Sequence, residues 1–292
     1  MPLPESPLTR RVTSRATIEK RADVLARTIS AEMGKVAWDA KGEVGTIIGK
    51  VELSIRAQAE RAGARQENAS FGETALSHHP HGVLAVFGPF NFPGHLPNGH
   101  IVHALLAGNC VLLKPSEFTP GVGALMAEAW EEAGLPAGVL SLLHGARETG
   151  AALLDAPGLN GVLFTGSAHT GALIHRKFAG RQDVLLALEL GGNNPLIVWP
   201  PVDLKAAANL IVHSAFATSG QRCSCARRLI VPENTDGQSI IDALASLAEK
   251  VAVGAADAAP EPFMGPLINA HAADRAVQMQ EGLVTIGAKT VL

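Results

Sequence analysis

The sequence predicts an α/β protein built around a mainly parallel β-sheet. From residue 82 onward, short apolar runs alternate with segments whose apolar residues have helical spacing, and this alternation is typical of parallel sheets with crossover helices. The apolar runs are nearly continuous, as expected of strands buried on both faces. The segment 119–134 has Pro120 early and Gly134 at its end, as helix termini prefer.

The elements follow in order along the chain. Two helical patterns come first, over 15–35 and around 44–55, and the polar residues 56–70 mark the end of this lead-in. Strands are expected at 82–88, 110–114, 139–145, 161–166, 184–190, 195–199, 227–232 and, at the end of the chain, 287–292. Helices are expected at 95–108, 119–134, 202–220 and 239–254, and another begins after the turn at 164–171. A boundary near 190–200 predicts two domains, 1–190 and 191–292.

The composition excludes several classes of protein. The 292 residues are 47% hydrophobic and 17% charged, with a net charge of −3. They can bury one large core or two modest ones, and they lack both the basic charge of a nucleic-acid partner and the high charge of disorder. No apolar run reaches the ~18–20 residues that span a bilayer, and residues 1–15 lack the apolar segment of a secretory signal. Three cysteines are not a disulfide framework, so we expect a reduced, cytoplasmic protein.

Cys223 is the first candidate for chemistry. In SGQRCSCARRL it follows Arg222 and precedes Arg227 and Arg228. Nearby positive charge lowers a thiol pKa from ~8.5 toward neutrality, and the thiolate is the reactive species. A buried free cysteine is an equally good interpretation. A metal site at Cys223 and Cys225 lacks two further ligands at suitable spacing, so we expect no metal there.

Two polar residues lie where apolar strands end. Glu189 precedes Gly191 and Gly192, and such a carboxylate can act as a general base or simply face water. Asn91 lies just past a strand. Its amide can donate to a developing oxyanion or serve ordinary turn chemistry.

A nucleotide site is suggested by two further segments. Lys114 and Glu117 follow a strand of the same sheet, at the edge where open α/β sheets bind ligands; they can hold the hydroxyls of an adenosine ribose or form a solvent-exposed pair. The turn FTGSAHTG places Ser167 at a helix start, which can receive a pyrophosphate. The spacing of Gly166 and Gly171 is a weak fingerprint.

The histidines form two groups. His78, His79 and His81 precede a strand, and His95, His100 and His103 share one helix. Because neither group belongs to a His-Glu-x-x-His pattern, we expect a polar pocket wall rather than a metal site.

Together and in this order, these segments resemble the aldehyde dehydrogenase superfamily. The resemblance runs from about Ala16 to the end of the chain and rests on Asn91, Lys114, Glu117, the FTGS turn, ELGGNNP and the GQRC loop. It implies a Rossmann-like cofactor domain with a mainly parallel sheet, plus an incomplete α/β catalytic domain. Family members are longer, so we expect this chain to be truncated at both ends.

The resemblance implies a role for each motif. Cys223, not Cys225, is the nucleophile, and the Asn91 side chain and the Cys223 N–H hold the oxyanion. Hydride passes to NAD, and Glu189 activates water to hydrolyse the thioester that remains. The cofactor-binding residues implied are Phe90, Lys114, Glu117, Gly145, Gly166, Ser167, Gly171 and Leu190. A carboxylate at Glu117 favours NAD over NADP because it repels a 2′-phosphate.

The substrate implied is an anionic semialdehyde. In this family the helix after Phe92 lines the substrate tunnel, and here it carries His95, while Arg222 adjoins the nucleophile. Unpaired carboxylates are costly to bury, so cationic groups suit an anionic substrate. Another semialdehyde, or a non-catalytic nucleotide-binding remnant, remains open. Full-length family members are homo-oligomers.

Overall fold

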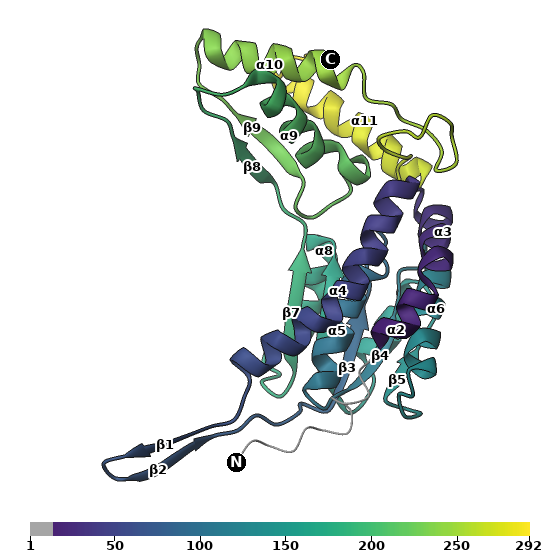
Figure 1. Ribbon diagram of the computed structural model, residues 1–292, viewed down its shortest axis with the longest axis vertical. Helices are drawn as coiled ribbons and strands as arrows, with labels where there is room; N and C mark the ends of the chain where they lie inside the picture. The colour runs from purple at the N-terminus through teal and green to yellow at the C-terminus, as the bar shows by residue number, and fades with distance from the viewer. Residues whose placement is uncertain (1–13) are drawn as a thin grey trace. The chain divides into compact units, whose positions relative to one another are not determined.

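The computed structural model describes residues 14–292, so almost all of the segment tested for a secretory signal lies outside the described residues. The chain divides into two compact units (Figure 1). Unit 1 contains residues 14–32 and Ala40–Leu190, and unit 2 contains Met33–Asp39 and Gly191–Leu292. Met33–Asp39 therefore packs with the second unit, although both of its sequence neighbours belong to the first.

Unit 1 is built on a five-stranded parallel sheet in the order β5-β4-β3-β6-β7. Its strands are β3 (Val83–Phe87), β4 (Cys110–Lys114), β5 (Leu140–Leu142), β6 (Leu159–Gly166) and β7 (Leu185–Leu190). The chain moves from β3 outward to β4 and β5, then returns to place β6 on the other side of β3. The carboxyl ends of β3 and β6 therefore flank the reversal of strand order, which is where open α/β sheets bind ligands.

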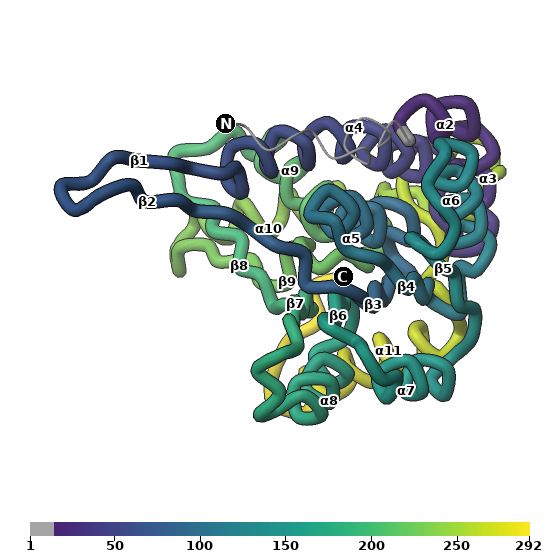
Figure 2. The backbone as a smooth tube through the Cα atoms, turned by 90° about the horizontal axis from the view of Figure 1, so that it is seen from below, coloured from purple at the N-terminus to yellow at the C-terminus, as the bar shows by residue number. Residues whose placement is uncertain are grey.

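Helices cover both faces of this sheet (Figure 2). One face carries α4 (Ala37–Arg61), α5 (His95–Leu106) and α6 (Pro120–Glu132), and the other carries α7 (Arg147–Leu154) and α8 (Ala168–Lys177). Successive side chains of a strand point to opposite faces. Leu84 and Val86 of β3 accordingly join the first apolar cluster, and Ala85 and Phe87 join the second.

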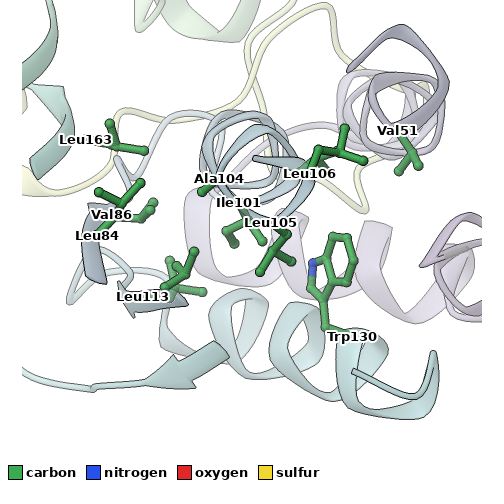
Figure 3. Close-up of a cluster of buried hydrophobic side chains, with 12 residues drawn as sticks. Val51, Leu84, Val86, Ile101, Ala104, Leu105, Leu106, Leu113, Trp130 and Leu163 are labelled. Atoms are coloured by element: carbon green, nitrogen blue, oxygen red, sulfur yellow. The ribbon is translucent and has the colours of Figure 1, made fainter. Parts of the chain in front are cut away.

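The first cluster is the core of unit 1 (Figure 3). Ile101 and Leu105 of α5 are 0% exposed, and Val51 of α4 and Trp130 of α6 are 3% and 1% exposed. Burying one such apolar side chain contributes roughly 1.5–3 kcal/mol. The helices α2 (Ser14–Lys20) and α3 (Ala22–Met33) form a further cluster with α4 and α6.

A hairpin interrupts the polar segment after α4. The strands β1 (Arg65–Ala69) and β2 (Gly72–Leu76) pair antiparallel and project from the rest of unit 1 (Figure 1). Phe71 at its tip is 83% exposed. The sequence predicted only the end of a helical lead-in here, because strands without a buried face carry no apolar alternation to detect.

Unit 2 contains a two-stranded parallel sheet, β8 (Asn194–Ile197) and β9 (Ala226–Ile230). Its helices are α9 (Leu204–Phe216), the short 3₁₀ helix η1 (Ala217–Gly220), α10 (Thr235–Ala248) and α11 (Ala270–Thr285). The helix expected to reach Gly220 ends instead at Phe216, because Thr218 and Ser219 take left-handed backbone angles.

Two further expectations were wrong. The last residues, 287–292, contain no strand and follow α11, which has no buried residue. The outer strand β7 is also not buried on both faces, since Leu185 is 40% exposed. An edge strand can therefore carry the same apolar run as a central strand. Within residues 14–292, no helix has both the length and the apolar character needed to cross a membrane.

Candidate functional site

Lys114 joins two loops at the carboxyl edge of the unit 1 sheet. It ends β4 and is 6% exposed, and its Nζ donates to the carbonyl oxygens of Pro115 at 2.9 Å and Gly145 at 2.6 Å. Burial lowers its pKa, an effect that the neighbouring charge of Glu117 opposes. Gly145 has φ 146°, and a Cβ there would lie 2.0 Å from Thr149 Oγ1. The loops after β4 and β5 are thus fixed to each other, with the exposed Glu117 beside them.

The turn between β6 and α8 forms a small-residue cradle at a helix N-terminus. Ser167 is the N-cap of α8, and its Oγ accepts a hydrogen bond from Thr170 N at 3.1 Å. A Cβ at Gly166 or Gly171 would lie 2.5 Å from the side chains of Phe164 and Leu190, respectively. The first N–H groups of a helix have no partner within the helix, so such an N-terminus can bind an anion such as a pyrophosphate. This turn therefore places the N-terminus of α8 at the carboxyl edge of the sheet, and that position is compatible with the pyrophosphate of a dinucleotide.

A half-buried histidine lies next to the strand pair β6 and β7. His100 Nε2 is 3.2 Å from Thr165 Oγ1, and Thr165 is paired in register with Glu189. Burial lowers the pKa of His100 to about 4, and the charges of His103 and Lys50 lower it further. His100 is therefore neutral at pH 7. The sequence placed His100 in a pocket wall but did not reveal Thr165 as its partner, because the two residues are far apart in the chain.

The Asn91 loop is held by a carboxylate from α4. Asn91 Oδ1 accepts a hydrogen bond from Phe92 N at 3.0 Å, which fixes the rotation of the amide. Glu43 is 2% exposed, and its Oε1 accepts from Gly94 N at 2.9 Å and His95 N at 3.1 Å. A negative charge at a helix N-terminus is stabilising. Glu43 therefore anchors the start of α5 directly after Asn91, a role that sequence reasoning missed.

Aromatic contacts position two other predicted residues of unit 1. The ring of Phe90 meets Phe118 edge-on with centroids 6.3 Å apart. The ring of His95 meets Phe92 in the same way at 6.2 Å.

The cysteine loop of unit 2 presents one thiol and buries the other. Cys223 is exposed, while Cys225 is 2% exposed. Asn194 Nδ2 donates to the carbonyl oxygens of both, at 2.7 Å for Cys223 and 2.9 Å for Cys225. This geometry favours the nucleophile assignment of Cys223 over that of Cys225, because only the exposed thiol can meet a substrate.

The arginines around this loop bind protein groups. Arg222 forms an ion pair with Asp39 at 2.9 Å. Arg227 donates to the Gly220 carbonyl at 3.0 Å, and Arg228 donates to that of Asn193 at 3.1 Å. The sequence predicted these cations as neighbours of the thiol but did not predict the carboxylate. No group of three or more His, Cys, Asp or Glu side chains suited to a metal ion occurs among residues 14–292.

The predicted residues fall into two sets. Those at the sheet edge, including Asn91 and Glu189, belong to unit 1, whereas Arg222 and Cys223 belong to unit 2. The convergence of both sets on one substrate stays a prediction.

These features define an α/β protein with a parallel sheet and an exposed thiol on a hydrogen-bonded loop. The family model described as "Aldehyde dehydrogenase family" matches residues 12–292, and the chain belongs to this family.

One curated relative is the N-succinylglutamate 5-semialdehyde dehydrogenase of Ectopseudomonas mendocina, which is 53% identical over 277 residues. That match covers 95% of this chain and 57% of the relative, so the chain spans little more than half the relative's length. The 1-pyrroline-5-carboxylate dehydrogenase of Thermus with bound NAD has a TM-score of 0.87 at 30% identity, covering 96% of this chain and 55% of its own. The NADP-dependent glyceraldehyde-3-phosphate dehydrogenase of Bacillus halodurans, complexed with NADP, has a TM-score of 0.88 at 28% identity. That match covers 98% of this chain and 61% of the dehydrogenase.

Proposed function

We propose that this chain carries the cofactor-binding part and the nucleophile loop of an NAD-dependent semialdehyde dehydrogenase. The substrate we infer is N-succinyl-L-glutamate 5-semialdehyde, oxidised to N-succinyl-L-glutamate in arginine catabolism. The observation that carries this proposal is the exposed Cys223 on a fixed loop, in a chain 53% identical over 95% of its length to a protein of that name.

Cys223 would attack the aldehyde carbon as the thiolate and form a thiohemiacetal. The Asn91 amide and the Cys223 backbone N–H would hold the oxyanion, and losing one such donor typically costs about 10²–10³ in rate. NAD, when bound, would supply the acceptor for the hydride. Glu189 would then take a proton from water, which attacks the thioester on Cys223 and releases the acid. A Glu189 in this position favours hydrolysis over transfer of the acyl group to coenzyme A.

The cofactor would lie at the carboxyl edge of the unit 1 sheet. The cradle at Gly166, Ser167 and Gly171 supports a pyrophosphate there, and Glu117, exposed beside the Lys114 junction, supports a ribose. Similar structures hold NAD in one case and NADP in another. We favour NAD because a carboxylate at Glu117 would repel a 2′-phosphate.

The carboxylates of the substrate would need cationic or hydrogen-bonding partners. Arg222 precedes the nucleophile, and His95 begins the helix that follows the oxyanion loop. We propose both as substrate contacts. Because Arg222 also binds Asp39 and Thr218, kcat/KM for charged and neutral aldehydes should be compared in Arg222→Ala and Asp39→Ala: a loss of preference for charged aldehydes in Arg222→Ala only would support the substrate contact.

The test is to incubate the chain with the semialdehyde and NAD and to follow NADH absorbance. Cys223→Ala should abolish NADH formation, whereas Cys110→Ala in β4 should retain it. Glu189→Gln should retain an initial burst but lose turnover, because acylation precedes hydrolysis. NADH formation that survives Cys223→Ala would contradict the mechanism. NAD binding without any turnover would instead support a non-catalytic nucleotide-binding chain.

A further inference from the structure

The backbone just before the nucleophile loop is strained. Thr218 has φ 57° and ψ 30°, and Ser219 has φ 57° and ψ 34°. Left-handed angles cost a residue other than glycine about 1–3 kcal/mol, and they are a genuine outlier for a β-branched residue such as Thr218. Such strain persists only where the surroundings determine the conformation. Contacts outside the loop must therefore hold these two residues.

Asp39 supplies the contact to Thr218. The Thr218 hydroxyl donates to Asp39 Oδ2 at 2.6 Å and accepts from Arg222 Nε at 2.7 Å, while Arg222 Nη2 donates to Asp39 Oδ1 at 2.9 Å. The three side chains thus form a closed ring. The Asp39 side chain is 5% exposed, and a carboxylate this buried is tolerated only when it is paired and hydrogen-bonded.

The segment that carries Asp39 is itself fixed within unit 2. Trp38 N donates to Glu261 Oε1 at 2.8 Å, and Trp38 Nε1 donates to the Phe263 carbonyl at 3.1 Å. Glu261 and Phe263 belong to a short segment, residues 261–265, and the Ser219 hydroxyl donates to the carbonyl of Gly265 in the same segment at 2.6 Å. The segment 261–265 therefore supports both the Asp39 segment and the strained turn.

We propose that Asp39 is the positioning residue of the nucleophile loop: through Thr218 and Arg222 it holds the strained turn that presents Cys223 and keeps Cys225 buried. Its function in catalysis rests on the proposed role of Cys223 as nucleophile. Its positioning of the loop does not, because the accessibility of the two thiols can be measured without turnover. Asn194, which binds the carbonyls of both cysteines, supports the loop independently of Asp39.

The three cysteines give a direct readout. Cys223 is exposed, Cys225 is buried, and Cys110 in unit 1 is an internal reference of intermediate exposure. Iodoacetamide is added to the native chain, and alkylation of each cysteine is followed by peptide mass spectrometry. In Asp39→Ala we expect the alkylation rate of Cys225 to rise at least tenfold, with that of Cys110 unchanged. Asp39→Asn should give a smaller rise, because it keeps the shape but loses the charge.

The matched control is Asp203→Ala, which removes the N-cap of α9 in the same unit, where Asp203 Oδ1 accepts from Ala206 N at 2.7 Å. It should lower stability without exposing Cys225. The proposal is overturned if Asp39→Ala leaves the Cys225 rate unchanged, or if Asp203→Ala raises it equally.

A second variant tests whether the strained backbone of Thr218, rather than a general loss of stability, exposes Cys225 in Asp39→Ala. Glycine adopts left-handed angles at little cost, so Thr218→Gly added to Asp39→Ala should restore most of the protection of Cys225. Absence of rescue would overturn the route through Thr218.

In a chain with dehydrogenase activity, Asp39→Asn should lower kcat about tenfold with the KM for NAD unchanged, because the cofactor site belongs to unit 1. A wild-type chain without turnover would contradict the proposed function, while the alkylation pattern would still decide the role of Asp39.

Discussion

The sheet of unit 1 and the cysteine loop of unit 2 are held in different ways. Val86, Ile101 and Leu105 are 0% exposed, and their apolar burial packs α5 onto the hydrogen-bonded strands of the sheet. In the loop, Asp39 accepts a hydrogen bond from the strained Thr218, and Asn194 donates to the carbonyl oxygens of Cys223 and Cys225. Apolar burial has no preferred direction, whereas a hydrogen bond is lost when one atom is replaced. The sheet core should therefore tolerate replacement by an apolar side chain of similar volume, whereas the loop should not tolerate the loss of a single polar atom.

Leu105→Ala should have the largest effect on stability. The side chain is 0% exposed in the unit 1 core, so we expect a loss of about 2–5 kcal/mol from lost burial and the cavity left behind. Leu105→Met is the control and should cost less than about 1.5 kcal/mol. Urea unfolding measures both. A loss in Leu105→Ala no greater than in Leu105→Met would contradict the account of the sheet.

His100, a half-buried polar residue of unit 1, gives a pH-dependent prediction. Its pKa is 6.5 in the ordinary state and about 4 in the folded state, so the unfolded chain binds more protons between these values. The free energy of unfolding is therefore unaffected by His100 above pH 6.5, the pKa of His100 in the unfolded chain. As the pH falls from there toward about 4, protonation of the unfolded chain lowers the free energy of unfolding by roughly 3 kcal/mol in total.

His100→Gln keeps a polar group but cannot titrate in this range. Urea unfolding of both proteins across these pH values should show a shallower acid loss in the variant. Parallel pH curves would contradict the neutral state assigned to His100.

The sequence predicted the sheet better than the loop for a physical reason. Strands such as β3 and β4 are apolar runs, and their burial follows from composition and period. The pairing of Asp39 with Arg222 joins residues 183 positions apart, and no local pattern records it. The motifs predicted roles for Cys223 and Lys114, but they did not predict the hydrogen-bond partners that the structure gives these loops. Whether the motif residues converge on one substrate stays a prediction.

Asn194→Ala tests the loop at a second point. Its amide binds two carbonyl oxygens, and each hydrogen bond contributes about 0.5–1.5 kcal/mol. We expect a loss of about 1–2 kcal/mol and faster alkylation of Cys225. Asn209→Ala on α9, where the amide binds only the Lys205 carbonyl at 2.8 Å, is the control and should leave Cys225 protected. Equal Cys225 rates in the two variants would show that Asn194 does not support the loop.

Asp183→Asn should have the smallest effect on the free energy of unfolding, although Asp183, like Asp39, forms an ion pair with an arginine. Asp183 Oδ2 lies 2.6 Å from Arg181 Nη2, and hydrogen bonds from that guanidinium lower the Asp183 pKa to about 2. Both side chains are more than half exposed, at 62% and 54%, and exposed pairs contribute little because water and salt screen them. We expect urea unfolding at pH 7 to detect no change in Asp183→Asn and a clear loss in Asp39→Asn. The exposed Arg181–Asp183 pair is the shorter of the two, so distance alone predicts the larger loss of stability there. Equal losses of stability in the two variants would show that burial does not decide which ion pair stabilises the fold.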